Sequence, residues 1–81
     1  MQKIRILKSE IIEFLHRANK STYANKNAPK VESTNLNSED YRFEEDDWIY
    51  HDTYWTGEQD FSFIGQEIIF KSRRQVFGAN Y

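Results

Sequence analysis

The sequence contains no cysteine, one proline and three glycines in 81 residues. Without cysteine there is no disulfide, and no thiolate is present to hold zinc. No apolar run approaches the roughly 18 residues that a transmembrane helix needs, and the first residues lack the apolar core of a signal peptide. The glycines are isolated, so there is no phosphate-binding loop. These absences favour a cytoplasmic protein without a cofactor or a membrane association.

The chain is rich in aromatic residues, with six Phe, five Tyr and two Trp. A domain of this size buries only about 60% of its unfolded surface, and aromatic side chains bury the most area per residue. We therefore expect a single domain over residues 1–81, with most of the aromatics in its core.

The charges are unevenly spread along the chain. Residues 1–30 hold seven Lys or Arg against two Glu, whereas residues 31–60 hold ten Asp or Glu against one Arg. An acidic middle argues against a nucleic-acid partner, which needs a basic surface. It is able to attract a basic partner, but acidic runs are more often solvated turns.

Residues 8–20 have the pattern of an amphipathic helix. Ser9 is the expected N-cap, with acidic residues in the first turns and basic residues near the end. The apolar stripe that should pack on the rest of the protein has the helical spacing i, i+3, i+4, i+7. It consists of Ile11, Phe14, Leu15 and Ala18. Residues 24–39 have no apolar period and are expected to form a long loop, either functional or disordered.

From residue 40 onward the apolar period is two, which indicates β-strands. Short polar segments divide this region into four strands, so the predicted fold is α+β, one N-terminal helix packed on a four-stranded antiparallel β-meander. The expected strands begin at Tyr41, Trp48, Phe61 and Arg74, and the expected turns are residues 44–47, 56–59 and 72–73. Gly65 inside the third strand suggests a bulge or a close backbone approach.

A two-residue turn at 72–73 pairs Lys71 with Arg74, Ile69 with Val76 and Glu67 with Gly78. Both faces of the resulting sheet are partly apolar, although one helix covers only one face. We therefore expect a homodimer or a protein partner, with residues 24–39 folding over the second face as the alternative. The expected interaction surface consists of Trp48, Tyr50 and Trp55.

A few polar residues interrupt the apolar strands and form the candidate ligand-binding set. They are Asp52, Tyr54, Glu67 and Asn80. Two carboxylates on neighbouring strands are able to act as an acid–base pair, but sheet-face carboxylates are more often hydrogen-bonded to tyrosine hydroxyls or solvated. His51 and Asp52 are adjacent in a strand and point to opposite faces, which argues against a metal site. We assign no catalytic residue and no metal ligand.

Four short blocks resemble an uncharacterised bacterial family of unknown function, whose members occur alone or C-terminal to helix-turn-helix regulators. The blocks are residues 14–24 (FLHRANKSTYA), 50–54 (YHDTY), 63–67 (FIGQE) and 76–81 (VFGANY). They match the N-terminal half of that family, which continues into a second β-rich portion, and the hairpin near Gly57 is longer here. The resemblance implies a fold and no catalytic residues.

The sequence alone favours a small binding or interaction module that acts through an aromatic sheet face. One alternative is a small-ligand binder or enzyme that uses Asp52, Glu67 and Asn80. Another is an accessory regulatory protein of bacterial or phage origin. No motif in the sequence decides between them.

Overall fold

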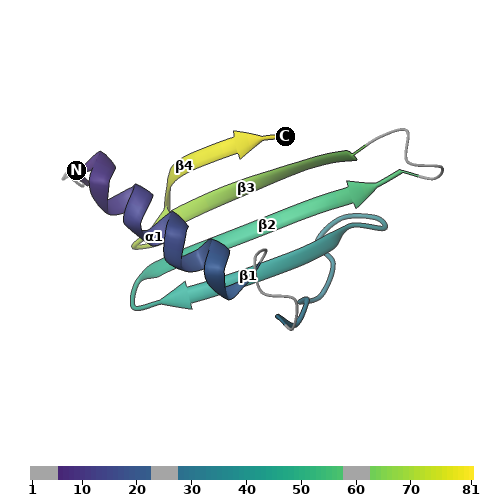
Figure 1. Ribbon diagram of the computed structural model, residues 1–81, viewed down its shortest axis with the longest axis horizontal. Helices are drawn as coiled ribbons and strands as arrows, with labels where there is room; N and C mark the ends of the chain where they lie inside the picture. The colour runs from purple at the N-terminus through teal and green to yellow at the C-terminus, as the bar shows by residue number, and fades with distance from the viewer. Residues whose placement is uncertain (1–5, 23–27, 58–62) are drawn as a thin grey trace.

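The structure, a computed structural model, describes residues 6–22, 28–57 and 63–81. In these residues it contains the helix α1 (Lys8–Ser21) and four strands. The strands are β1 (Glu39–Glu45), β2 (Trp48–Thr56), β3 (Phe63–Lys71) and β4 (Arg74–Asn80). They form one antiparallel sheet in the order β1-β2-β3-β4 (Figure 1), which confirms the predicted α+β meander. The predicted start of the third strand and part of the 56–59 turn lie outside the described residues.

The helix begins two residues earlier than an N-cap at Ser9 would allow. Leu7 is the N-cap in an extended conformation, and its carbonyl accepts hydrogen bonds from the amides of Glu10 and Ile11. No side chain caps this end, and Ser9 lies inside the first turn, so the Ser9 prediction is wrong. Ile6 already packs against the core, and this apolar contact carries the chain into the helix before Ser9. A cap bond contributes only about 1 kcal/mol, which apolar packing can outweigh.

The core lies between α1 and one end of the sheet. Phe14 and Ala18 are fully buried against Trp48, Tyr50 and Ile69. The Phe14 ring stacks on Trp48 with a centroid separation of 5.0 Å and on Phe43 at 5.7 Å. The other two residues of the predicted stripe, Ile11 and Leu15, are partly buried beside this cluster. The helical stripe therefore packs on the sheet as expected.

The two turns at this end of the sheet are tied together by Asp47. The 72–73 turn has positive φ at both Ser72 (49°) and Arg73 (66°), as a type I′ hairpin requires. The Asp47 carboxylate accepts hydrogen bonds from Ser72 Oγ at 2.6 Å and from Lys71 Nζ. The Ser72 amide donates to the Asp47 carbonyl at 3.0 Å. Part of the acidic segment thus fastens the β1–β2 turn to the β3–β4 turn.

The pairing of β3 with β4 differs from the prediction beyond the first pair. Lys71 lies opposite Arg74 as expected, but a bulge follows, and Ile69 lies opposite Phe77 rather than Val76. Glu67 consequently lies opposite Ala79 rather than Gly78. The predicted pairs were wrong because Val76 is an extra residue in β4, and one extra residue exchanges the faces of everything beyond it.

The helix is shorter than the sheet that it packs on. Fourteen helical residues span about 21 Å, whereas nine strand residues span about 30 Å. The helix crosses the end where β2 begins, and β2 and β3 extend well beyond it (Figure 1). On this face α1 buries Trp48 and Tyr50, and the strands continue past it to Asp52 and Tyr54.

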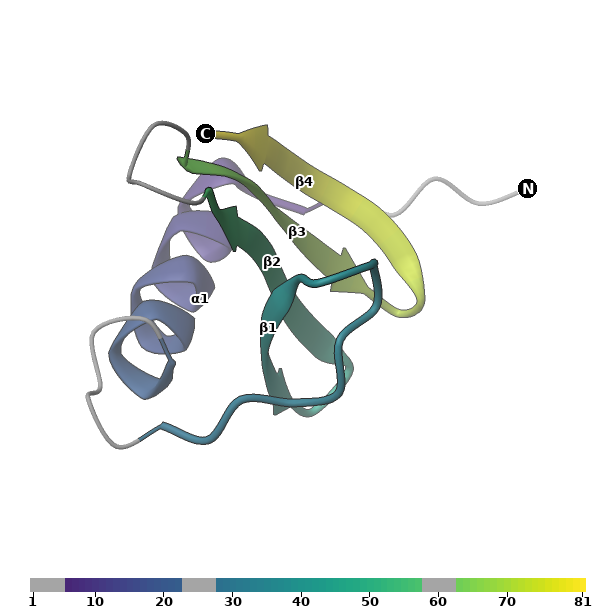
Figure 2. The ribbon, with the colours of Figure 1, turned by 90° about the vertical axis from the view of Figure 1, so that its right-hand side faces the viewer.

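Residues 28–38 pass β1 and reach the face opposite α1 (Figure 2). The Trp55 indole donates a hydrogen bond to the Leu36 carbonyl at 2.8 Å, and Thr34 Oγ1 donates to Asp40 at 2.7 Å. The described part of the predicted loop therefore covers a portion of the second sheet face.

Within residues 6–22, 28–57 and 63–81, no helix is long and apolar enough to cross a membrane.

The buried position of Phe14 predicts a large loss of stability in Phe14→Ala. Removing a core Phe side chain lowers the free energy of unfolding by about 3–5 kcal/mol, which approaches the total stability of a domain this small. Urea unfolding followed by circular dichroism measures the change, with Phe14→Leu as a milder variant. Ile12→Ala is the matched control, because Ile12 lies on the same helix with 43% of its surface exposed. Equal, small effects at both positions would contradict the observed packing.

Candidate ligand-binding site

Two carboxylates face each other on the part of the sheet that α1 leaves uncovered. Asp52 in β2 lies directly opposite Glu67 in β3, and both side chains are on the helix side of the sheet. They line a cavity of about 250 Å³ together with Tyr50 and Tyr81, which we call the Asp52 pocket. The pocket results from the alternation of side chains along β2. Trp48, Tyr50 and Asp52 are on the same face of the strand, so Asp52 follows directly after the two residues that lie beneath α1.

Each carboxylate accepts a hydrogen bond from a tyrosine hydroxyl. Tyr50 Oη donates to Glu67 Oε2 at 2.9 Å, and Tyr81 Oη donates to Asp52 Oδ1. The expectation that these carboxylates bond to tyrosine hydroxyls is therefore confirmed. Tyr50 also belongs to the core under α1, so one side chain joins the core to the pocket.

The second carboxylate oxygen of Asp52, Oδ2, is a buried polar atom of the pocket. Asp52 is only 1% exposed, and Oδ2 has no hydrogen-bond partner among the described residues. Burial raises the pKa of Asp52, the hydrogen bond from Tyr81 opposes this shift, and the nearby charge of Glu67 reinforces it. Burial and the neighbouring carboxylates also raise the pKa of the Tyr50 hydroxyl far above its ordinary value. Asp52 Oδ2 is thus a buried acceptor that the described residues leave unsatisfied.

Gly65 allows Tyr81 to close one side of the pocket. The two residues exchange backbone hydrogen bonds of 2.7 and 2.8 Å, which extends the sheet beyond β4. The Tyr81 ring lies directly over Gly65, and a Cβ atom there would be 2.6 Å from ring carbons. Of the two alternatives predicted for Gly65, close approach is the one observed, and the bulge occurs at Val76 instead.

A row of aromatic rings continues from Tyr81 across the same face. The centroid separations are 5.6 Å from Tyr81 to Phe63, 5.7 Å from Phe63 to Tyr54 and 6.2 Å from Tyr54 to Tyr41. The ammonium group of Lys30 lies 5.9 Å from the Tyr54 ring centroid. The pocket therefore has acidic groups at its base and aromatic surface beside it.

The structure brings together three of the four predicted ligand-binding residues. Asp52, Tyr54 and Glu67 share the helix side of the sheet. Asn80 lies opposite Gln66 on the other side, where it lines a separate cavity, so its assignment to this set is corrected. The bulge at Val76 is the reason, because it moves Asn80 to the opposite face from Glu67. Tyr50 and Tyr81 also line the pocket, and the sequence did not predict this role for them. The i, i+2 spacing of Tyr50 and Asp52, which places both side chains on one face of a strand, was the signal that could have identified Tyr50.

The predicted interaction surface is not a single surface. Trp48 and Tyr50 are 8% and 1% exposed and belong to the core beneath α1. Trp55 lies on the opposite face, where its indole bonds to Leu36. The helix covers the half of that face that holds Trp48 and Tyr50, which removes these two side chains from solvent.

A second polar cluster, on the face opposite α1, is centred on Asp40. This fully buried carboxylate accepts hydrogen bonds from His51 Nε2 at 2.6 Å and from three hydroxyl groups. The hydroxyls belong to Thr34, Ser38 and Thr53. Burial raises the pKa of Asp40, but the bonds from Ser38, His51 and Thr34 outweigh it and lower the pKa to about 2. With its acceptors occupied, Asp40 fastens residues 34–38 to the sheet.

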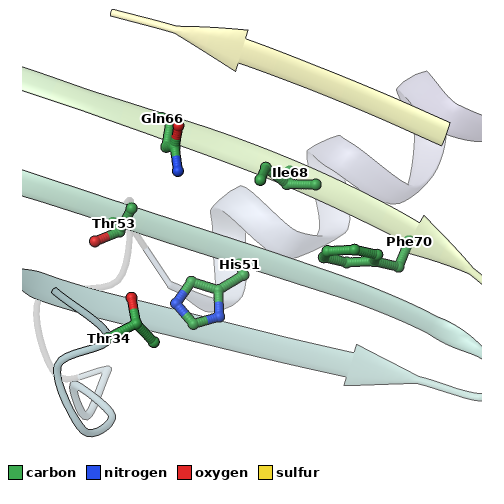
Figure 3. Close-up of a pocket in the computed structure, with 6 residues that line it drawn as sticks. All are labelled: Thr34, His51, Thr53, Gln66, Ile68 and Phe70. Carbon is green, nitrogen blue, oxygen red and sulfur yellow. The ribbon is translucent and has the colours of Figure 1, made fainter. Parts of the chain in front are cut away.

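A cavity of about 200 Å³ lies beside this cluster (Figure 3). Figure 3 shows Thr34, from the loop, beside His51 and Thr53 of β2, with Gln66, Ile68 and Phe70 of β3 across from them. The hydrogen bond to the buried Asp40 carboxylate gives His51 a structural role. In the part of the chain that the structure describes, no group of three or more Asp, Glu or His side chains is placed to hold a metal ion.

Comparison with known proteins found no matching family model, no matching curated protein and no matching solved structure. The resemblance to a bacterial family of unknown function therefore stays a prediction.

The Asp40 cluster predicts a specific loss of stability in acid. Because the folded pKa of about 2 is below the ordinary value of 3.8, this group stabilises the fold above pH 3.8. The contribution, about 2 kcal/mol, is lost as the pH falls through 2. Asp40→Asn should therefore show a shallower fall in unfolding free energy between pH 4 and pH 2, measured by urea denaturation.

Asp46→Asn is the control for this measurement. Asp46 is an exposed turn residue with φ of 54°, a conformation that Asn adopts readily. It should keep the wild-type pH dependence. An unchanged acid slope in Asp40→Asn would show that Asp40 is not the ionised centre of the cluster.

Proposed function

We propose that this protein is a small-ligand-binding module and that its site is the Asp52 pocket. The observation that carries the proposal is the buried Oδ2 atom of Asp52, which has no partner among the described residues. Buried polar atoms in folded proteins are nearly always hydrogen-bonded, since an unpaired one is destabilising. An unpaired carboxylate facing a cavity is explained if a ligand supplies the missing donor.

The surroundings of Asp52 support the same proposal. Small-molecule sites are typically apolar or aromatic cavities with a few fixed polar groups. Here Tyr50 and Tyr81 supply the aromatic surface and Glu67 supplies a second carboxylate. The cavity of about 250 Å³ suits a small ligand or the end of a larger one.

This proposal replaces the aromatic sheet face that the sequence favoured. It keeps the ligand-binding alternative but not the triad with Asn80, which lies on the other face.

The first test is the stability of Asp52→Asn. The amide keeps an acceptor for Tyr81 and removes a buried charge next to Glu67, so the free energy of unfolding should rise by about 0.5–2 kcal/mol at neutral pH. Since burial raises the pKa of Asp52, its ionisation destabilises the fold as the pH rises through that pKa. The gain should therefore shrink in acid, where wild-type Asp52 is protonated. Asp47→Asn, which removes a charge that accepts bonds from Ser72 and Lys71, should instead destabilise the fold.

The second part of this test is a fragment screen by ¹⁵N NMR. Hits should shift the amide signals of Glu67 and Gly65, and the shifts should be absent in Asp52→Asn but present in Asp47→Asn. If Asp52→Asn were less stable than wild type and no fragment perturbed these signals, Asp52 would be structural and the proposal would fail.

A second candidate function is self-association through the sheet face opposite α1. Residues 31–38 bond to Trp55 and Asp40 on the β1–β2 side of this face. On the β3 side, Ile64 is 58% exposed, and Ile68 and Phe70 are only partly buried. A two-fold dimer would bury the same apolar patch on both copies.

Sedimentation equilibrium across micromolar concentrations tests this candidate. We expect a dimer that Ile64→Lys dissociates, because a lysine would have to be desolvated in the contact. Ile12→Lys, on the outer surface of α1, is the matched control and should leave the dimer intact. A monomer mass for the wild type at the highest concentration would rule out the dimer.

A further inference from the structure

The charged side chains that line the Asp52 pocket, among the described residues, are both carboxylates. Asp52 and Glu67 lie on directly paired positions, and the other two lining residues are tyrosines. Both tyrosine hydroxyls already donate to these carboxylates. No basic side chain lines the pocket in the described residues, so the negative charge there is not balanced by a cation from the pocket itself.

Aromatic rings on this face of the sheet already hold ammonium groups. The Nζ atom of Lys71 lies 4.7 Å from the Trp48 ring centroid, and that of Lys30 lies 5.9 Å from the Tyr54 centroid. Both rings are on the same face as Asp52 and lie on either side of it along β2. These contacts are cation–π interactions, in which the ring face attracts a positive charge. The ring of Tyr81, a residue that is 40% exposed, lies beside Asp52 and offers the same kind of surface.

The hydrogen bonds also distinguish one kind of cation from another. Tyr81 donates to Oδ1 of Asp52, so the buried Oδ2 is the oxygen left without a partner among the described residues. A guanidinium group binds a carboxylate best through two parallel bonds to both oxygens, and here it would have to share Oδ1 with the Tyr81 hydroxyl. An ammonium group is a compact donor that binds a single oxygen. A hydrated metal ion would need more oxygen ligands than this aromatic-walled cavity provides.

Resting on the proposed ligand-binding function, we propose that the Asp52 pocket recognises an alkylammonium group. The ammonium donates to Asp52 Oδ2 and lies within the field of Glu67, while its alkyl chain lies against the Tyr81 ring. The same group is found on a free amine and on a lysine side chain of another protein, and these two sources share the recognition chemistry.

Titrations followed by ¹⁵N NMR test this proposal with matched probes. They are n-butylammonium, butylguanidinium, 1-butanol and butyrate, together with Nα-acetyl-lysine N-methylamide as the peptide form of the amine. We expect n-butylammonium to shift the Glu67 and Gly65 signals and to bind at least about tenfold more tightly than butylguanidinium, a difference of about 1.4 kcal/mol. The alcohol and butyrate should not bind. Equal binding of the lysine derivative would identify a protein side chain as a source, whereas binding of n-butylammonium alone would favour a free amine.

Two substitutions make the test specific. Asp52→Asn should reduce n-butylammonium binding at least tenfold, and Asp47→Asn, an equal loss of charge in a turn, should not. Tyr81→Phe keeps the aromatic ring and opens Oδ1, so the preference for ammonium over guanidinium should fall or reverse.

The outcomes separate this inference from the proposed function. Equal binding of 1-butanol or butyrate at the same signals would overturn the ammonium assignment and leave the pocket as a ligand site. A wild-type protein that binds neither these probes nor any screened fragment would overturn both. Unchanged selectivity in Tyr81→Phe would contradict the role given to the hydrogen bond between Tyr81 and Asp52 Oδ1.

Discussion

The structure depends on a mismatch of length between one helix and the sheet beneath it. Strand alternation sends every second residue of β2 to the helix side, and α1 covers only the first two of them, Trp48 and Tyr50. The same row then continues to Asp52 without a helix above it. The core and the pocket are therefore consecutive parts of one strand face, and Tyr50 contributes its ring to the first and its hydroxyl to the second.

Much of the fold could be predicted from local patterns. The helical stripe around Phe14, the period-two strands and the 72–73 turn each depend on a few neighbouring residues, and each is present. Ser9 failed because a distant contact, the packing of Ile6, outweighed a local cap. Propensity and capping are weak effects that tertiary packing overrides.

The candidate site could be predicted only in part. Asp52 and Glu67 were identified because polar residues are conspicuous in apolar strands, and both lie in the pocket. Asn80 was misplaced because a single extra residue at Val76 changes the face of all that follows it, and no residue pattern in β4 marks the bulge. The contacts of Tyr81 with Gly65 and Asp52 depend on this register, and the Asp40 cluster depends on the path of a loop without periodicity. Such long-range arrangements are not encoded in short windows of sequence.

The short bridge between Val31 and Asp40 protects one edge of the sheet from pairing with another strand. The Val31 amide donates to the Asp40 carbonyl at 2.9 Å, and the chain thus places its own backbone along the outer side of β1. Pro29, two residues earlier, has no amide hydrogen with which to continue the ladder. An open edge strand is a template for edge-to-edge aggregation, and bridging and proline are two ways of blocking it. At β4 the corresponding protection is chemical, since that strand begins with the charged Arg74 and is bent by its bulge. The two edges of the sheet are thus protected in different ways. The β1 edge is covered by the chain's own backbone, and the β4 edge is a poor template for another strand.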